Sequence, residues 1–351
     1  MEEKNKKVVF HFLNTGNYSG AENVVVNIAQ LVDRYEHVYV SPNGDIDEVL
    51  KRNNISHVAI RKLSFFSFWH IISKYKPDIV HAHDFKASII AGILSNKVTN
   101  YGGKLISQLH KNDARMRKIS IVSVLFFLIL NRFSKIIVVS QSVIDEYVFK
   151  YTLEKKTVVI NNIVNLEKIE RESLIFNAAS YDIIYLARIS NEKNPLRFLN
   201  IIERVNERRP VKVVWVGDGS MLNVVKRTIS LKKLDKVVQL LGFQSNPYPY
   251  IVASKISILT SKYEGFGLSA LEAQLLGKPV VSTDVGGIRA IVTEDTGLLT
   301  NKDDEFVNEI IKLLDNQHYY LEKQINAKNR SKKINDISEY VKKINRIYAE
   351  S

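Results

Sequence analysis

The 351-residue sequence contains no cysteine and only seven prolines. Without cysteine the chain can form no disulfide framework, no thiolate metal site and no cysteine nucleophile, which fits a reducing compartment. The most apolar run, Ile119–Leu130, has 12 residues and falls short of the ~20 that a membrane-spanning helix needs. These absences favour a cytoplasmic protein, and the length allows two domains of ordinary size, each with its own core.

Positive charge is abundant and unevenly distributed. The formal net charge is +13, and residues Arg61–Lys135 alone contain thirteen Lys and Arg against three Asp, a net charge of +10. The same window contains the aromatic residues Phe65, Phe66, Phe68 and Trp69. Basic charge beside apolar surface favours the anionic face of a membrane or a lipid-phosphate acceptor. We expect the Ile119–Leu130 run itself to be mainly a buried core helix. No nucleic-acid partner is expected, because no RRM, KH or helix-turn-helix signature is present.

Short apolar strands alternate with amphipathic helices along the chain. Strand-like runs begin at Val8 and continue to Ile160; a polar stretch follows, and the alternation starts again at Ile183. This pattern predicts parallel sheets covered by helices on both faces. We therefore expect two doubly wound, Rossmann-like α/β domains, residues 1–168 and residues 169–351, facing each other across a ligand-binding cleft.

The most informative segment is Tyr263–Ala273, in which Glu264 and Glu272 flank a Gly-Phe-Gly turn. Gly265 and Gly267 let the backbone approach a ligand closely, and Ser269 is a good N-cap for a following helix. A helix start presented by such a turn favours an anion such as phosphate, while the carboxylates suit sugar or ribose hydroxyls. The pattern indicates a nucleotide-sugar site. Alternatively, Ser269 and Glu272 form only a capping box.

Other strand-to-helix loops of the second domain carry charge or glycine. Arg188 and Lys193 follow one strand and precede Pro195, where both cations can face a diphosphate. Later loops contain Gly217, Gly242 with Phe243, and residues 284–287. Each loop alone is weak evidence, because solvated cations and turn glycines are common. Five such loops at one sheet edge favour a ligand site.

The first domain offers a glycine loop and several histidines. Gly16 lies in a loop that opens a helix and can approach phosphates, and Ser19 with Glu22 suggests a capping box there. His110 ends a strand, where it can bond a sugar hydroxyl or move a proton. We expect only one of the pair His81 and His83, preferably His83, to face the cleft. No metal is expected, since residues 45–48 are better explained as an acidic first helical turn.

Together these segments resemble the retaining GT-B glycosyltransferases of family 4, of the kind that builds bacterial capsular or exopolysaccharides. Glu264 to Glu272 matches the E-x7-E motif of that family, and Arg188 and Lys193 match its strand-end arginine and following lysine. By this resemblance, Arg188 and Lys193 neutralise the donor diphosphate, and Glu264 holds sugar hydroxyls. The remaining implied roles are backbone contacts to the donor from Gly265, Phe266, Gly267 and Leu268, ribose binding by Glu272, and sugar or acceptor contacts by His110.

The resemblance implies transfer of a hexosyl unit, with retention and without a metal or other cofactor, from a nucleotide sugar to a lipid-linked saccharide acceptor. A UDP-sugar is favoured over a GDP-sugar, and a peripheral location on the inner membrane face is expected. The segment Asn161–Asn165 departs from the usual Pro-Asn-Gly-x-Asp of the family and affects a hinge turn, with no catalytic group involved. A non-catalytic GT-B scaffold protein is the alternative, which the four intact residues Arg188, Lys193, Glu264 and Glu272 disfavour.

Overall fold

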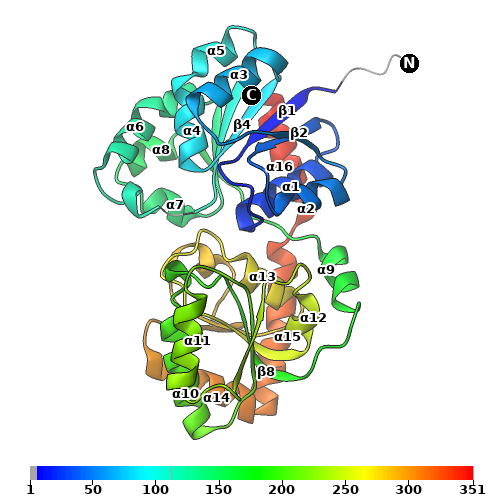
Figure 1. The fold of residues 1–351 in the computed structure, drawn as a ribbon, viewed down its shortest axis with the longest axis vertical. Helices are drawn as coiled ribbons and strands as arrows, with labels where there is room; N and C mark the ends of the chain where they lie inside the picture. Colours follow the sequence, from blue (N-terminus) through cyan, green and yellow to red (C-terminus); the bar gives the residue numbers. More distant parts are fainter. Residues whose placement is uncertain (1–5, 112, 351) are drawn as a thin grey trace. The chain divides into compact units, whose positions relative to one another are not determined.

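The computed structural model describes residues 6–111 and 113–350 and forms two compact units. Unit 1 comprises residues 1–163 and 336–351, and unit 2 comprises residues 164–335. Each unit is a parallel sheet with helices on both faces (Figure 1). The two Rossmann-like domains expected from the alternating pattern are therefore confirmed. The cleft between them stays a prediction.

Unit 1 contains a seven-stranded sheet in the order β3-β2-β1-β4-β5-β6-β7. Its strands are β1 (Val8–Phe12), β2 (Glu36–Ser41), β3 (Ser56–Ala59), β4 (Ile79–His83), β5 (Lys104–Leu109), β6 (Lys135–Val138) and β7 (Thr157–Val159). Its helices are α1 (Gly20–Leu31), α2 (Ile46–Arg52), α3 (Phe65–Tyr75), α4 (Asp84–Ile93), α5 (Ser95–Thr99), α6 (Ile121–Ile129), α7 (Gln141–Asp145), α8 (Lys150–Glu154) and α16 (Ile337–Glu350). Two 3-10 turns, η1 (Ala114–Met116) and η2 (Leu130–Arg132), flank α6. The central strands β1 and β4 are almost fully buried because helices cover both faces of the sheet, whereas the edge strands β3 and β7 are only partly buried.

Unit 2 contains a six-stranded parallel sheet in the order β10-β9-β8-β11-β12-β13. Its strands are β8 (Tyr181–Leu186), β9 (Val213–Val216), β10 (Val238–Gly242), β11 (Ser254–Leu259), β12 (Val280–Ser282) and β13 (Gly297–Leu299). Its helices are α9 (Leu166–Ser173), α10 (Pro195–Arg208), α11 (Leu222–Leu231), α12 (Tyr248–Val252), α13 (Leu268–Leu275), α14 (Asp303–Asp315) and α15 (Gln317–Ile334). The 3-10 turns η3 (Asn191–Lys193) and η4 (Gly286–Ala290) follow β8 and β12. Its core contains three aromatic rings in contact: Tyr185 stacks on Phe198, and Trp215 meets both edge-on.

The last helix, α16, belongs to unit 1, which differs from the ranges expected from the sequence. That expectation placed every C-terminal helix in the second domain. Tyr340, Ile344, Ile347 and Tyr348 are buried on the apolar side of α16, and the Tyr348 hydroxyl lies 2.9 Å from Nδ1 of His81 in β4. The chain thus enters unit 2 at Val164 and leaves it at Asn335, whose side chain bonds both the N–H and the carbonyl of Val164 at 2.7 and 2.8 Å.

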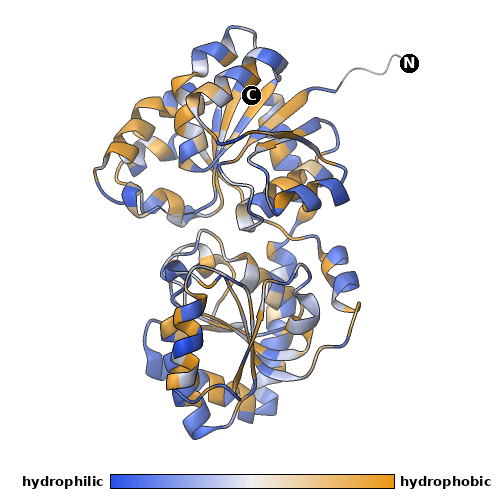
Figure 2. Ribbon diagram, in the orientation of Figure 1, coloured by the Kyte–Doolittle hydropathy of each residue, from blue (hydrophilic) through white to orange (hydrophobic). Residues whose placement is uncertain are grey.

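Helix α6 is much less buried than the sequence suggested. Within the Ile119–Leu130 run only Ser123, Phe126, Ile129 and Leu130 are buried. Ile121, Leu125 and Leu128 are exposed at the spacing of one helical face. The expectation that most of this run is core is therefore wrong. Figure 2 shows the apolar colour of α6 in unit 1.

Candidate active site

Lys193 and Glu264 form an ion pair in unit 2, between the loop after β8 and the turn after β11. The Lys193 ammonium donates to Oε1 of Glu264 at 2.5 Å, and the Ser261 hydroxyl donates to the same oxygen at 2.7 Å. The hydroxyl of Tyr185 donates to the Lys193 carbonyl at 2.5 Å, which fixes the loop to the core. The structure thus brings together two of the residues that the sequence pattern singled out.

Glycine shapes the turn between Glu264 and helix α13. Gly267 has φ +99° and is the N-cap of α13, which begins at Leu268. No side chain caps this helix, so the expected N-cap at Ser269 and the capping box with Glu272 are not formed. The positive φ is what favours glycine here, because the Cβ of another residue would contact only the movable end of the Ile288 side chain. The first N–H groups of α13 are left without a side-chain acceptor, as an anion site requires.

Glu272 lies in the second turn of α13 and is buried. Burial raises the pKa of its carboxyl group to about 7, and the positive charge of Lys168 offsets only part of this effect. Within the described residues, Glu272 has no ion-pair partner within 4.0 Å. A buried, unpaired carboxylate is costly unless hydroxyl donors reach it, so Glu272 is suited to bind a ligand hydroxyl.

Arg188 follows β8 and presents an exposed guanidinium group. Its side chain is 60% exposed, and Nη2 lies 3.4 Å from the Glu192 carboxylate. An exposed pair of this kind contributes little to stability and separates easily. Arg188 can therefore be redirected to a ligand phosphate at little cost.

Most of the predicted glycines in unit 2 allow loops to pack on one another. A Cβ on Gly217 would lie 2.1 Å from the carbonyl oxygen of Ala187, and one on Gly287 would lie 2.2 Å from that of Gly265. Gly286 has φ +55°, and its Cβ would lie 1.9 Å from the Glu264 carbonyl oxygen. These glycines therefore hold the loops after β8, β9, β11 and β12 against each other.

The other predicted donor-binding residues differ in exposure. Phe266 is buried and anchors the glycine turn, whereas Phe243 is 57% exposed. Gly242 has φ +70° and open space around it, so its conformation alone favours glycine. In unit 1, Gly16 packs against the backbone of Asn43, where a Cβ would lie 2.2 Å from the carbonyl oxygen.

Five histidines are buried on one side of the unit 1 sheet. Nε2 of His37 lies 2.9 Å from the Val32 carbonyl oxygen, and its Nδ1 lies 2.9 Å from Nε2 of His11. Nδ1 of His11 lies 3.0 Å from Nε2 of His83, whose Nδ1 lies 2.9 Å from Nε2 of His110. We call these four residues, His37, His11, His83 and His110, the histidine row. Burial lowers the pKa of all four rings, so they are neutral near pH 7.

His81 shares this face with His83, since residues two apart in a strand point the same way. Their ring centroids are 4.2 Å apart, so both rings lie on one face of the sheet, and that only His83 faces the cleft stays a prediction. Side-chain nitrogens of His11, His81 and His83 lie within 4.8 Å of one another, a spacing that could admit a metal ion. The 3.0 Å hydrogen bond between His11 and His83 already occupies two of these nitrogens. The expected absence of a metal stays a prediction.

Asp84 positions His110. It begins α4 with φ +64°, a strained conformation for a residue other than glycine. Its carboxylate accepts a 3.1 Å hydrogen bond from the His110 backbone N–H. In the loop that contains Gly16, the Glu22 carboxylate accepts hydrogen bonds from the Thr15 and Ser19 hydroxyls. Ser19 makes no side-chain cap bond to α1. Glu22 therefore holds this loop together and does more than cap the helix.

Sequence reasoning missed Asp84, Ser261 and two members of the histidine row, His11 and His37. Only Asp84 had a signal in the sequence, its place directly after the His-Ala-His strand. His11 and His37 become neighbours only through the parallel register of β1 and β2.

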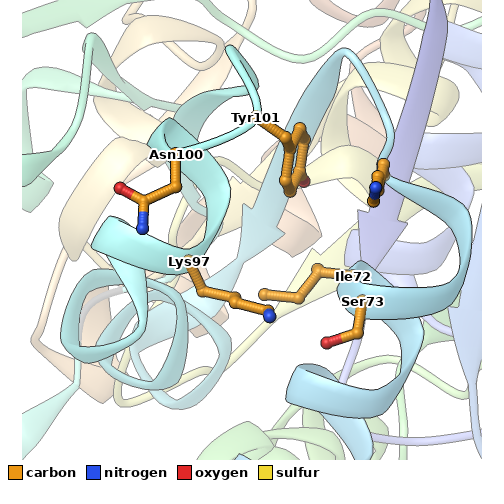
Figure 3. Close-up of a pocket in the computed structure, with 6 residues that line it drawn as sticks. Ile72, Ser73, Lys97, Asn100 and Tyr101 are labelled. Carbon is orange, nitrogen blue, oxygen red and sulfur yellow. The ribbon is translucent and has the colours of Figure 1, made fainter.

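A separate pocket of unit 1 lies away from these residues. It is lined by Ile72 and Ser73 of α3, by Lys76, and by Lys97, Asn100 and Tyr101 at the end of α5 (Figure 3). These residues precede β4 and β5 in the chain, so the pocket lies at the amino-terminal edge of the sheet. His83 and His110 lie at the opposite, carboxyl-terminal edge, where ligands of open α/β sheets bind.

Two family profiles match consecutive parts of the chain. The profile of Glycosyltransferase Family 4 matches residues 18–168, and that of Glycosyl transferases group 1 matches residues 167–334. The two matches adjoin and together span most of the chain. The chain belongs to the GT-B glycosyltransferases of group 1, with a family 4 amino-terminal half.

The chain is also similar to individual glycosyltransferases and to a solved GT-B structure. An uncharacterized glycosyltransferase of Methanocaldococcus jannaschii is 30% identical over 61% of this chain, and the match spans 57% of that protein. The UDP-Gal:alpha-D-GlcNAc-diphosphoundecaprenol alpha-1,3-galactosyltransferase of Escherichia coli is 27% identical over 84% of this chain and 80% of its own length. Anabaena HepE, solved in complex with UDP-glucose, superposes with a TM-score of 0.83 at 20% identity, covering 98% of this chain and 100% of that one. The last likeness shows the GT-B fold.

Proposed function

We propose that this protein transfers a hexosyl unit from a UDP-sugar to a lipid-linked saccharide acceptor, with retention of anomeric configuration. The observation that carries the proposal is the Lys193–Glu264 pair beside the uncapped start of α13. A cation, a free helix N-terminus and a carboxylate together match a sugar diphosphate. The related galactosyltransferase uses a UDP-sugar, and HepE binds UDP-glucose, which favours uridine as the base.

Lys193 exchanges partners when the donor binds. In the free protein it neutralises Glu264, and the incoming diphosphate offers a stronger anion. Once Lys193 and Arg188 contact the diphosphate, Glu264 is released to accept hydroxyls of the sugar. The two cations then stabilise the negative charge that develops on the leaving nucleoside diphosphate. Glu272 receives the ribose hydroxyls, and the N–H groups of residues 265–268 contact the sugar and phosphate.

Retention follows in this scheme from attack on the same face of the sugar from which the diphosphate leaves. The departing phosphate itself takes the proton of the acceptor hydroxyl, so no protein nucleophile and no metal are required. His110 contacts the sugar or the acceptor from unit 1. In the alternative, a non-catalytic scaffold protein, the Lys193–Glu264 ion pair would not have to separate.

The experiment that tests the donor is thermal unfolding with UDP, GDP, ADP or NAD in separate samples. A nucleotide at 100 times its dissociation constant adds about 2.7 kcal/mol of stability. We expect stabilisation by UDP and a smaller effect of the others. Absence of any shift contradicts the transferase proposal and favours the scaffold; a shift with GDP alone retains transfer and changes the donor base.

The acceptor is proposed to be presented by an anionic membrane surface that α6 contacts. Ile119, Ile121 and Leu128 are each at least 66% exposed, and Lys118 and Arg132 flank them. Apolar side chains ringed by positive charge match the boundary of anionic headgroups and acyl chains. No described helix has both the length and the apolar character to cross a bilayer, so the contact would be peripheral.

Co-sedimentation with vesicles tests this surface. Vesicles containing phosphatidylglycerol should bind the wild-type protein, and Leu128→Glu should abolish binding. Leu231, 83% exposed on α11 of unit 2, provides the matched control, so Leu231→Glu should bind normally. Equal binding of both variants, or equal binding to neutral vesicles, would contradict the assignment of α6.

A further inference from the structure

The histidine row crosses four adjacent strands of the unit 1 sheet. His37 lies near the start of β2, His11 in β1, His83 at the end of β4, and His110 directly after β5. The order of these strands in the sheet is β2-β1-β4-β5, so each ring meets the ring of the neighbouring strand. All four side chains are buried, and the ring centroids are 5.1 to 5.3 Å apart.

One end of the row has a fixed direction. A backbone carbonyl can only accept, so Nε2 of His37 must carry the hydrogen that bonds the Val32 oxygen. In a neutral ring the other nitrogen is then an acceptor, so Nε2 of His11 must donate to Nδ1 of His37. The same reasoning makes Nε2 of His83 the donor to His11, and Nε2 of His110 the donor to His83.

The far end of the row is thereby determined as well. Nδ1 of His110 carries a lone pair, is buried, and has no hydrogen-bond partner among the described residues. We infer that the Val32 carbonyl, acting through His37, His11 and His83, holds His110 in the tautomer that offers Nδ1 as a hydrogen-bond acceptor to a ligand hydroxyl. His37, His11 and His83 are positioning residues in this scheme.

A sugar hydroxyl is the ligand group that this acceptor suits. The lone pair of a neutral ring nitrogen can accept a hydrogen bond from a hydroxyl group. It forms none with a phosphate, which has no hydrogen to donate near pH 7. Asp84 fixes the His110 backbone, so the ring is held at both its main chain and its Nε2. The assignment of a sugar hydroxyl as the ligand rests on the proposed function. The assignment of the His110 tautomer rests only on the hydrogen bonds of the row.

Nitrogen-15 NMR of histidine-labelled protein tests the tautomer without any substrate. The two ring nitrogens of a neutral histidine give separate signals according to which carries hydrogen. We expect hydrogen on Nε2 and none on Nδ1 for all four residues near pH 7, assigned through single His→Gln variants. Hydrogen on Nδ1 of His110, a charged ring, or metal bound to His11 and His83 in the purified protein would each overturn the inference.

The anchor is tested by changing His37, which lies at the opposite end of the row from His110. His37→Leu removes the acceptor for His11, so the His110 signals should change to a mixture of tautomers. His37→Asn keeps an oxygen near the place of Nδ1 and should restore the single wild-type tautomer. Folding is checked by urea unfolding of unit 1, followed through the fluorescence of Trp69 in α3 with Trp215 changed to Phe in each variant. If both variants keep the wild-type His110 signals, the row does not set the tautomer.

Turnover separates this inference from the proposed function. His110→Asn retains an acceptor near the Nδ1 position, and His110→Gln retains only a donor near Nε2. With the donor sugar that supports transfer, kcat/KM should be about fivefold higher for Asn than for Gln, the value of one hydrogen bond. The reverse order overturns the role of Nδ1. Failure of the wild-type protein to transfer any sugar refutes the proposed function and leaves the NMR result standing.

Discussion

The two sheets of this protein carry opposite kinds of chemistry. Unit 1 buries neutral rings that hydrogen-bond to one another, whereas unit 2 holds carboxylates and cations, with Lys193 and Glu264 paired between two loops and Glu272 unpaired in α13. Both sheets are parallel and both are covered by helices, so the architecture does not dictate this difference. It comes from which residues occupy the strands and the loops.

The difference shows how each unit meets the cost of burial. Neutral imidazoles can be buried in a sheet because most of their nitrogens are hydrogen-bonded, to one another or to the Val32 carbonyl, and no charge loses its hydration. The paired charges of unit 2, Lys193 and Glu264, lie in loops, where a ligand or water can replace a lost partner. One unit therefore suits orientation of hydroxyls, and the other suits binding of a charged leaving group.

The largest expected effect is an opposite response of the two units to acid. Burial lowers the pKa of His11, His37, His81, His83 and His110, so below about pH 6.5 the unfolded chain binds more protons than folded unit 1. Each of these residues can remove up to about 1.4 kcal/mol of stability per pH unit below that value. Burial raises the pKa of the Glu22 carboxyl group, so this residue gains stability in acid. It is a single group and offsets only part of the loss from the five histidines.

Fluorescence can follow each unit separately, because Trp69 lies in α3 and Trp215 in β9 and the sequence contains no other tryptophan. Urea unfolding of Trp215→Phe reports unit 1, and that of Trp69→Phe reports unit 2. From pH 7 to 5.5 unit 1 should lose several kcal/mol while unit 2 does not. Equal acid sensitivity of both units would remove the distinction between them.

Removing a cation from unit 2 should nearly abolish turnover. If the diphosphate contacts lower the barrier by about 4 kcal/mol, Arg188→Ala and Lys193→Ala each reduce kcat by about 10³-fold. Lys255, half exposed and paired with Asp182, supplies the control, and Lys255→Ala should leave kcat unchanged. Near-wild-type turnover of Arg188→Ala or Lys193→Ala would show that the diphosphate binds elsewhere.

Glu272→Gln should separate stability from binding. The pKa of about 7 lies above the 4.5 of an ordinary glutamate, so the charged form destabilises the fold progressively from pH 4.5 to above 7. Glutamine avoids this cost, and the variant should gain up to about 3 kcal/mol over wild type at pH 8 and little at pH 5. UDP should bind about tenfold more weakly at pH 8, because a charge-assisted bond is lost.

The matched control for this change is Glu207→Gln on the exposed side of α10, which should alter neither quantity. Calorimetry and urea unfolding at pH 5 and pH 8 measure both. A variant that is less stable than wild type at pH 8 would show that Glu272 is paired in solution.

The smallest expected effect distinguishes two glycines of unit 2. Gly286→Ala forces a Cβ against the Glu264 carbonyl at φ +55°, whereas Gly242→Ala meets open space at φ +70°. The second change should cost about 1 kcal/mol from conformation alone, and the first roughly 2 kcal/mol more. Urea unfolding followed through Trp215 measures both costs. Equal costs would show that the loop after β12 does not pack on the Glu264 turn.

Much of the fold followed from local patterns in the sequence. Apolar runs predicted the alternation of strands and helices from Val8 to Ile160 and again from Ile183, and so the two parallel sheets. The sequence singled out Lys193 and Glu264, 71 residues apart, without showing that they pair. The start of α13 could not be predicted, because the positive φ of Gly267 displaces Ser269 as the cap. Whether the other selected residues bind the donor stays a prediction.

The rest depends on contacts between distant segments. The histidine row needs the register of four strands, and no spacing in the sequence brings His37 near His110. The assignment of α16 to unit 1 depends on Tyr348 meeting His81, residues 267 positions apart. Such long-range hydrogen bonds carry no local signal.

The return of α16 to unit 1 has a consequence for how the protein is made. During synthesis, residues 6–163 leave the ribosome before Tyr348 is made. The sheet face that holds His81 therefore lacks α16 while unit 2 is translated. The unit that is synthesised first is completed last. A released chain that ends at Asn335 should therefore contain a complete unit 2 and an incomplete unit 1, open to chaperones and proteases.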